Sequence, residues 1–238
     1  MKKNIILALF LALGTTAIAQ NVKTKKNSAN MLDRNSDHII LQFGKLNWAG
    51  KPDSIATRGL SRTFNIHFIK DIIFKTDNRF SVGIGIGIGS DHLNLDKRNV
   101  TLTKNTSPVL TFPLQIGTIY TRTKLATTYL EAPVELRFAA NPANYDRSFK
   151  FALGVKVGQL IDVHLRRKKA EVNNSAVALP TLKEKDKSFF EKTRLAVTSR
   201  IGYGHFSLFG TYQINGFIKD ANNFNVRPFS MGICISGM

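Results

Sequence analysis

Hydrophobic and polar positions alternate with a period of two along most of the chain. The clearest stretch is 81–89, in which one valine and three isoleucines alternate with four glycines. Residues two apart share one face of a β-strand, so this segment has an aliphatic face and a glycine face. A soluble strand would lose conformational entropy and packing at every glycine. The pattern therefore favours a transmembrane strand, with aliphatic residues towards lipid and glycines towards a lumen crowded by larger side chains.

The same alternation predicts eight strands. We expect them at residues 37–47, 60–69, 79–89, 125–138, 149–158, 194–203, 205–214 and 228–236. The tight connections follow the second, fourth and sixth strands, and the longer ones follow the others. The two longest connections are 90–124, where an extra hairpin is possible, and 164–192. Outer-membrane barrels show this asymmetry between short periplasmic turns and long extracellular loops.

Alternation alone also fits a soluble lipocalin-like barrel. Aromatic residues separate the two cases, because they share the apolar parity and cluster at the strand ends that meet the tight turns: Phe68, Phe80, Phe138, Phe149, Tyr203 and Phe206. Such a girdle is typical of a membrane interface. The sequence therefore predicts an all-β fold, a transmembrane antiparallel up-and-down β-barrel of about eight strands with long extracellular loops.

The N-terminus has the features of an export signal. Two lysines precede an apolar run that ends at Ala17-Ile18-Ala19, the small-residue pattern of a cleavage site. We expect a signal peptide at 1–19, a flexible periplasmic leader at 20–36 and the barrel at 37–238. This organisation places the protein in the cell outer membrane of a Gram-negative bacterium, with its N-terminus in the periplasm.

Charged residues fall on the parity opposite to the lipid-facing one. They are Glu131, Glu135, Arg137, Lys156, Arg194 and Arg200, with Lys150 on the same parity. A lumen of about eight strands leaves little room for water, so we expect these groups to pair as a structural plug. A narrow ion path is the alternative.

The sequence indicates catalytic residues less clearly than it indicates the fold. Asp91 with His92, and Asp162 with His164, follow predicted strands and could act as general bases at the barrel mouth. No nucleophile accompanies them, and the five histidines lack metal-ligand spacing. Cys234 lies in an apolar strand, which suggests a small buried filler. We therefore expect neither enzymatic activity nor a cofactor or metal.

The formal net charge of +18 favours anionic neighbours. The export signal and the scattered basic residues argue against nucleic acid. The run Arg166-Arg167-Lys168-Lys169 lies in the second long connection and is a candidate anion-binding loop, with lipid phosphates or an acidic partner as ligands.

Three segments carry a resemblance to a known family. Residues 129–138 read Tyr-Leu-Glu-Ala-Pro-Val-Glu-Leu-Arg-Phe, and 151–156 and 229–233 add shorter matches. Together with the Ala19-Gln20 boundary, they resemble the outer-membrane β-barrel family of Bacteroidota that includes the PorT-like proteins. One departure is the C-terminus, which reads Ser-Gly-Met where family chains commonly end on an aromatic residue.

The resemblance implies a barrel without shared enzymatic activity, whose founding member is linked to protein secretion and surface assembly. We therefore expect a non-enzymatic, monomeric barrel that contacts outer-membrane lipids and acts as a scaffold or assembly and secretion subunit through its basic loops. A small ligand-binding or narrow-channel barrel is one alternative. An outer-membrane hydrolase that uses the Asp and His residues at the mouth is another.

Overall fold

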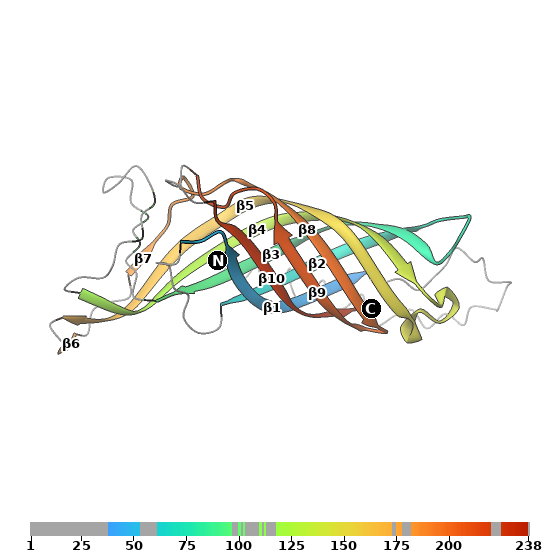
Figure 1. The fold of residues 1–238 in the computed structure, drawn as a ribbon, viewed down its shortest axis with the longest axis horizontal. Helices are drawn as coiled ribbons and strands as arrows, with labels where there is room; N and C mark the ends of the chain where they lie inside the picture. Colours follow the sequence, from blue (N-terminus) through green and yellow to red (C-terminus); the bar gives the residue numbers. More distant parts are fainter. Residues whose placement is uncertain are drawn as a thin grey trace, which may run out of the picture. The chain divides into compact units, whose positions relative to one another are not determined.

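The strands close into an antiparallel barrel in the computed structural model (Figure 1). The structure describes residues 38–52, 61–96, 118–172, 175–177, 182–219 and 225–237, and the single positions Val100, Leu102, Leu110 and Phe112. Eight long strands make the barrel: β1 (Ile39–Ala49), β2 (Arg62–Ile73), β3 (Phe80–Leu95), β4 (Thr118–Ala139), β5 (Phe149–Val172), β8 (Thr193–Tyr203), β9 (Phe206–Gln213) and β10 (Arg227–Ser236). The predicted fold class and the number of barrel strands are confirmed.

The topology is a simple meander. Each barrel strand pairs with its neighbours along the chain, and β1 pairs with β10 to close the ring. The strands of the closed sheet are staggered. A path that starts at Tyr203 of β8 and moves from each residue to its cross-strand partner returns to β8 at Thr193, ten positions away. A stagger of this size tilts eight strands by about 40° and leaves an interior that side chains can fill.

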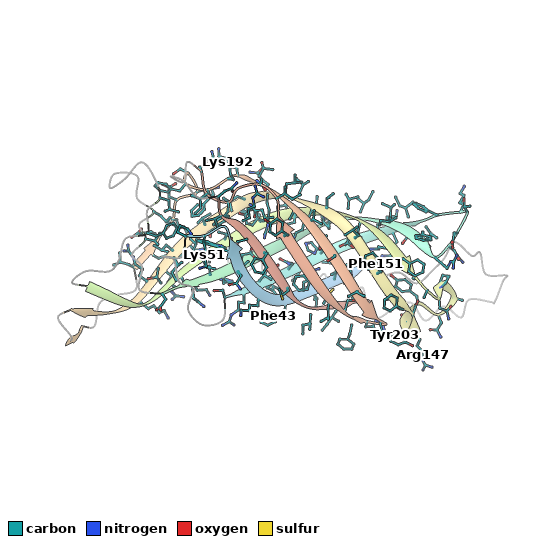
Figure 2. All side chains as sticks on the ribbon, viewed as in Figure 1. Phe43, Lys51, Arg147, Phe151, Lys192 and Tyr203 are labelled. Carbon is teal, nitrogen blue, oxygen red and sulfur yellow. The ribbon has the colours of Figure 1, made fainter. Side chains whose placement is uncertain are left out.

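The outer surface carries the apolar residues that the alternation placed there. Large hydrophobic side chains are exposed on all eight barrel strands. Towards the outer ends of β1, β2, β3 and β4, polar residues take over the outward face. The six girdle aromatics lie on this outward face, exposed or half-buried, and Tyr203 can be followed in Figure 2. The outward band of about nine residues per strand matches the length that crosses a bilayer.

The connections differ sharply between the two ends of the barrel. Residues 74–79 join β2 to β3, and only Gly204 and His205 join β8 to β9, where Gly204 has a φ of +59° that a two-residue turn requires. Between β4 and β5 lies η1 (Pro142–Arg147), a 3-10 helix in which the Asn141 side chain accepts a hydrogen bond from the backbone of Asn144 at 3.3 Å. The tight turns were predicted at this end, whereas the helical turn was not.

The two longest predicted connections were partly wrong, because strands continue into them. β3 reaches Leu95, β4 begins at Thr118, and β5 reaches Val172, so β4 and β5 project well beyond the other strands (Figure 1). Two short strands, β6 (Ser175–Val177) and β7 (Leu182–Glu184), pair with β5 in this projection. We call this part of the molecule the extension.

Some expectations concern residues outside this description. The signal peptide at 1–19, the leader at 20–36 and the C-terminal residue all lie outside the described residues. So does most of 97–117, within the connection 90–124 where an extra hairpin was possible. None of the described helical segments is long and apolar enough to span a membrane.

Candidate functional site

The barrel interior holds a network of buried charges. Its centre is Glu131 on β4, whose Oε2 lies 2.9 Å from Lys156 Nζ and 2.9 Å from His67 Nε2. The other carboxylate oxygen, Oε1, lies 3.3 Å from Arg194 Nη1, and the same nitrogen lies 2.9 Å from Asp91 Oδ2. Five strands thus contribute to one cluster: β2, β3, β4, β5 and β8.

A second cluster lies nearer the tight turns. Glu135 Oε2 accepts hydrogen bonds from Arg200 Nη2 at 2.5 Å and from Arg137 Nε at 3.1 Å. Arg137 Nη1 also donates to Asp71 Oδ1 at 2.5 Å. Below them, Lys150 Nζ lies 3.6 Å from the centre of the Tyr145 ring, which η1 brings under the lumen. All the cations of this cluster have carboxylates or a ring as partners, so the interior resembles a plug.

The structure brings together all six residues that the sequence placed in the lumen. It adds His67, Asp71 and Asp91, which sequence reasoning did not assign to this network. The alternation could have identified two of them, because Asp71 lies on the same strand face as His67 and Asp91 lies on the same face as Gly89. Both were missed because the predicted ends of β2 and β3 came too early.

The glycine face provides the space that this network needs. A side chain at Gly89 would meet Glu131 Oε1 at 2.8 Å, and one at Gly83 would meet Arg137 Nε at 2.7 Å. At Gly154 a side chain would meet the Cγ of Glu135 at 2.9 Å. Glycines from β3 and β5 therefore line the lumen where long charged side chains cross it, as the alternation predicted.

The interior changes character towards the extension. There a cluster of buried apolar residues fills the barrel, with members from β1, β3, β4, β5 and the segments between strands: Leu46, Trp48, Leu93, Leu95, Leu125, Leu160, Val163, Leu165, Phe189, Phe190, Phe217 and Ile218. The ring of Phe217 lies 5.4 Å from that of Trp48 and 5.0 Å from that of Phe190. A cavity between this apolar core and Asp91 leaves room for about one water molecule.

The two Asp and His pairs behave differently. Asp91 points into the lumen and binds Arg194, while His92 points outward and lies 3.3 Å from Ser90 Oγ. Because they lie on opposite faces of β3, they cannot act as a dyad. Asp162 and His164 do share a face, with Oδ2 and Nδ1 2.9 Å apart, and Lys185 Nζ lies 3.2 Å from Asp162 Oδ1. The hydrogen bond from His164 lowers the pKa of the Asp162 carboxyl.

The predicted anion-binding loop is not a loop. Residues 166–169 belong to β5, so their side chains alternate between the two faces. Arg166 and Lys168 are exposed on the outside, whereas Arg167 is buried and forms an ion pair with Glu184 of β7. The Lys169 side chain lies outside the described part of the chain. The run therefore cannot present four cations to one anion, and the sequence missed this because it placed the end of β5 too early.

Metal chemistry finds no support among the described residues, where no three His, Cys, Asp or Glu side chains gather. Cys234 is buried in the lumen, 3.9 Å from Arg200 Nη1. Among the described residues, the barrel has an apolar outer band and an interior occupied by charged and apolar side chains.

Comparison with known protein families agrees with this architecture. A model described as an outer membrane protein beta-barrel domain matches residues 23–237. The chain belongs to this outer-membrane β-barrel family. It is therefore an integral protein of the outer membrane, crossing it with strands whose outward faces are apolar. No curated protein matches the chain.

Proposed function

We propose that this outer-membrane barrel is a non-conducting, non-enzymatic scaffold that acts through its outer surfaces, as a subunit of a surface-assembly or secretion complex. Its tight turns and N-terminus face the periplasm, and the extension faces the cell exterior. The observation that carries the proposal is the lumen, which is filled at two levels. A protein whose interior is closed has only its outer surfaces with which to act.

The charged level disfavours an ion path. Glu131 and Asp91 face Lys156 and Arg194 in one cluster. Glu135 and Asp71 face Arg137 and Arg200 in the other, so two carboxylates offset two cations in each cluster. A permeating ion would have to separate these pairs, which costs several kcal/mol in a poorly hydrated interior. The apolar core is a second barrier to ion passage, because the cavity between it and Asp91 holds no more than about one water molecule.

The extension favours a scaffold. β4 and β5 stay paired from Tyr129 and Leu160 out to Thr118 and Val172, and β6 and β7 add further strand pairing to β5. The described inward side chains at the base of this region, such as Leu125, Val163 and Leu165, belong to the apolar core, so the base of the extension is a packed platform that can present fixed side chains to a partner. A PorT-like role in a protein complex agrees with such a platform.

The test is the size of the protein's native complex. The full chain is cross-linked in outer membranes of its own cells, extracted in mild detergent and sized, beside a variant in which 169–181 are replaced by a short Gly-Ser linker. We expect the wild type to run in a complex larger than the monomer and the variant to run as a monomer. A mobility shift between unheated and boiled samples shows that the variant barrel has folded.

Two results would overturn the proposal. One is a wild-type protein that runs as a monomer after cross-linking. The other is ion conductance in planar bilayers that rises stepwise as purified protein inserts, because a plugged lumen should leave the bilayer at its baseline. If the purified protein has hydrolytic activity and Asp162→Ala abolishes it, the hydrolase alternative is favoured instead.

A further inference from the structure

Basic side chains form a row on the outside of the barrel on the side of the extension. The row lies directly beyond the apolar band on β1 and β2, and further out on β4 and β5. The row consists of Lys45 on β1, Arg62 on β2, Lys124 on β4, Arg166 on β5 and Lys183 on β7, and we call it the basic rim. Four of these side chains are exposed and Lys124 is half-buried. On β1 and β2 the rim begins one outward position beyond the lipid-facing Phe43 and Phe64.

The strand register places cations of this row opposite one another. Lys45 is the cross-strand partner of Arg62, Lys124 is the partner of Arg166, and Arg166 is also the partner of Lys183. Like charges at directly opposed positions destabilise a sheet. Three such pairings in one row are therefore unfavourable unless an anion lies over them.

The local electrostatics agree with this crowding. Partial burial, followed by the charges of Arg62 and Arg166, lowers the pKa of the Lys124 ammonium. His92 lies between these residues and is opposite Arg62; burial and then the charge of Lys124 lower the pKa of its ring. The outward carboxylate nearby on β5, Asp162, is already engaged by His164 and Lys185, and Asp96 follows the end of β3.

The opposite end of the barrel is built differently. In the turn between β2 and β3, Arg79 is paired with Asp77, with Nη2 and Oδ2 2.9 Å apart. Lys70, Lys75 and Arg147 are exposed at this end and have none of the cross-strand pairings that join the rim residues among the described strands. The concentration of like charges is therefore a feature of one rim.

We propose that the basic rim binds the phosphate groups of outer-leaflet lipids. Its position supports a lipid over a soluble anion, because on β1 and β2 the apolar band that holds acyl chains begins directly below Lys45 and Arg62. Arginine and lysine side chains at this height reach the headgroup level, where clustered cations attract anionic lipid. Phosphate oxygens accept hydrogen bonds from several cations at once, and this would offset the repulsion between the paired rim residues.

The test measures lipid retained by the purified full-length barrel. The protein is refolded in detergent, incubated with diphosphoryl lipid A or with the same lipid lacking its phosphates, and analysed by native mass spectrometry. The rim variant carries Lys45→Gln, Lys124→Gln and Arg166→Gln. The matched control carries Lys70→Gln, Lys75→Gln and Arg147→Gln, which remove the same charge from the other end.

We expect the wild type and the control to prefer the diphosphoryl lipid strongly. Each rim cation should contribute about fivefold to this affinity, so the rim variant should lose on the order of 100-fold. The affinity should also fall as salt is raised, because exposed charges are screened. Heat-dependent gel mobility shows that each variant is folded. If the triple variant does not fold, the three substitutions are tested singly, and each should lower the lipid affinity about fivefold.

Three outcomes would overturn the proposal. They are equal retention of both lipids by the wild type, equal losses in the rim and control variants, and displacement of the lipid by inorganic phosphate alone at millimolar concentration. The last would identify a site for free anions. Lipid binding is measured on the isolated protein, so its failure leaves the scaffold proposal standing, and the reverse also holds.

Discussion

The lower and upper halves of this barrel have opposite interiors. Within the lipid band the lumen contains Glu131, Glu135 and their cationic partners, while the outer face is aliphatic and aromatic. In the extension the interior is apolar, with Leu93, Leu125 and Leu165, and the outer face carries His92, Lys124 and Arg166. β3, β4 and β5 pass through both halves.

The difference follows from the solvent outside the sheet. Against lipid, apolar side chains face outward and polar groups must be satisfied inside. Against water, the hydrophobic effect reverses the preference and the interior becomes an ordinary core. The basic rim begins at the boundary between the two halves, where Lys45 and Arg62 follow the lipid-facing Phe43 and Phe64.

Removing the central carboxylate should have the largest effect. Glu131→Gln keeps the shape of the side chain but leaves Lys156 and Arg194 buried without their shared counter-charge. We expect the free energy of unfolding to fall by about 3–5 kcal/mol, measured by urea titration of barrels folded into lipid vesicles. Asp77→Asn, which breaks an exposed pair in a turn, is the control and should change little.

A wild-type unfolding free energy in Glu131→Gln would contradict the plug. A second variant sharpens the test, because Glu131→Gln combined with Lys156→Met removes both partners of one pair. It should be more stable than Glu131→Gln alone, since one unpaired buried cation is gone.

The apolar half should respond locally. Phe190 is fully buried in the upper core, and its ring packs 5.0 Å from that of Phe217. Phe190→Ala should cost about 3 kcal/mol or more through the cavity it leaves. We expect the extension to become sensitive to protease while the heat-dependent gel shift of the barrel remains. Leu208→Ala, on the lipid-facing side of β9, is the control and should leave the extension protected. Loss of the gel shift in Phe190→Ala would show that the two halves unfold as one unit.

The glycine face gives a smaller effect. An alanine methyl at Gly87 would collide with the backbone oxygen of Ile66 and with the His67 ring, neither of which can move without disturbing β2. At Gly210 the nearest atom is Ser199 Oγ, 3.4 Å away, which is ordinary contact. Gly87→Ala should therefore lower the free energy of unfolding by about 1–3 kcal/mol in the same urea titration, and Gly210→Ala by much less. Equal effects would mean that the glycines are not required for space.

The reversal also explains what the sequence could predict. Within the lipid band the alternation identified strands, faces and charged lumen residues such as Glu135 and Arg200, because apolar residues there point outward on every strand. Beyond the band the alternation continues, but the apolar residues point inward and the polar ones outward. Leu93, Leu125 and Val163 therefore no longer mark an outward face. On β5 the register also shifts at the bulge opposite Thr128 and Tyr129, where both Ile161 and Asp162 come to lie on the outside.

Long-range pairing was beyond sequence reasoning for a different reason. Arg194 and Asp91 lie on β8 and β3, which are not neighbours in the sheet, and they meet only across the lumen. Their contact depends on the stagger of the closed barrel, which no local pattern reports. The basic rim is also a product of register, because Lys124 and Arg166 are remote in sequence and become cross-strand partners only when β4 pairs with β5.

The smallest predicted effect concerns pH at the base of the extension. The hydrogen bond from His164 lowers the pKa of Asp162 in the folded protein, and Lys185, one residue after β7, also binds this carboxylate. A group with a lowered folded pKa stabilises the fold above its unfolded pKa of about 4 and loses this contribution as the pH falls through the folded value. Acid should therefore loosen β7 from β5.

Hydrogen exchange of the β7 amides, corrected for the intrinsic rate, measures this loosening between pH 6 and pH 3. Glu184 of β7 is also a carboxylate, so the informative quantity is the difference between the wild type and Asp162→Asn. The variant should exchange faster at pH 6 and show a smaller change on acidification, whereas Asp77→Asn should match the wild type at both pH values. If Asp162→Asn keeps the full acid response, Glu184 and its partner Arg167 alone hold β7 in place.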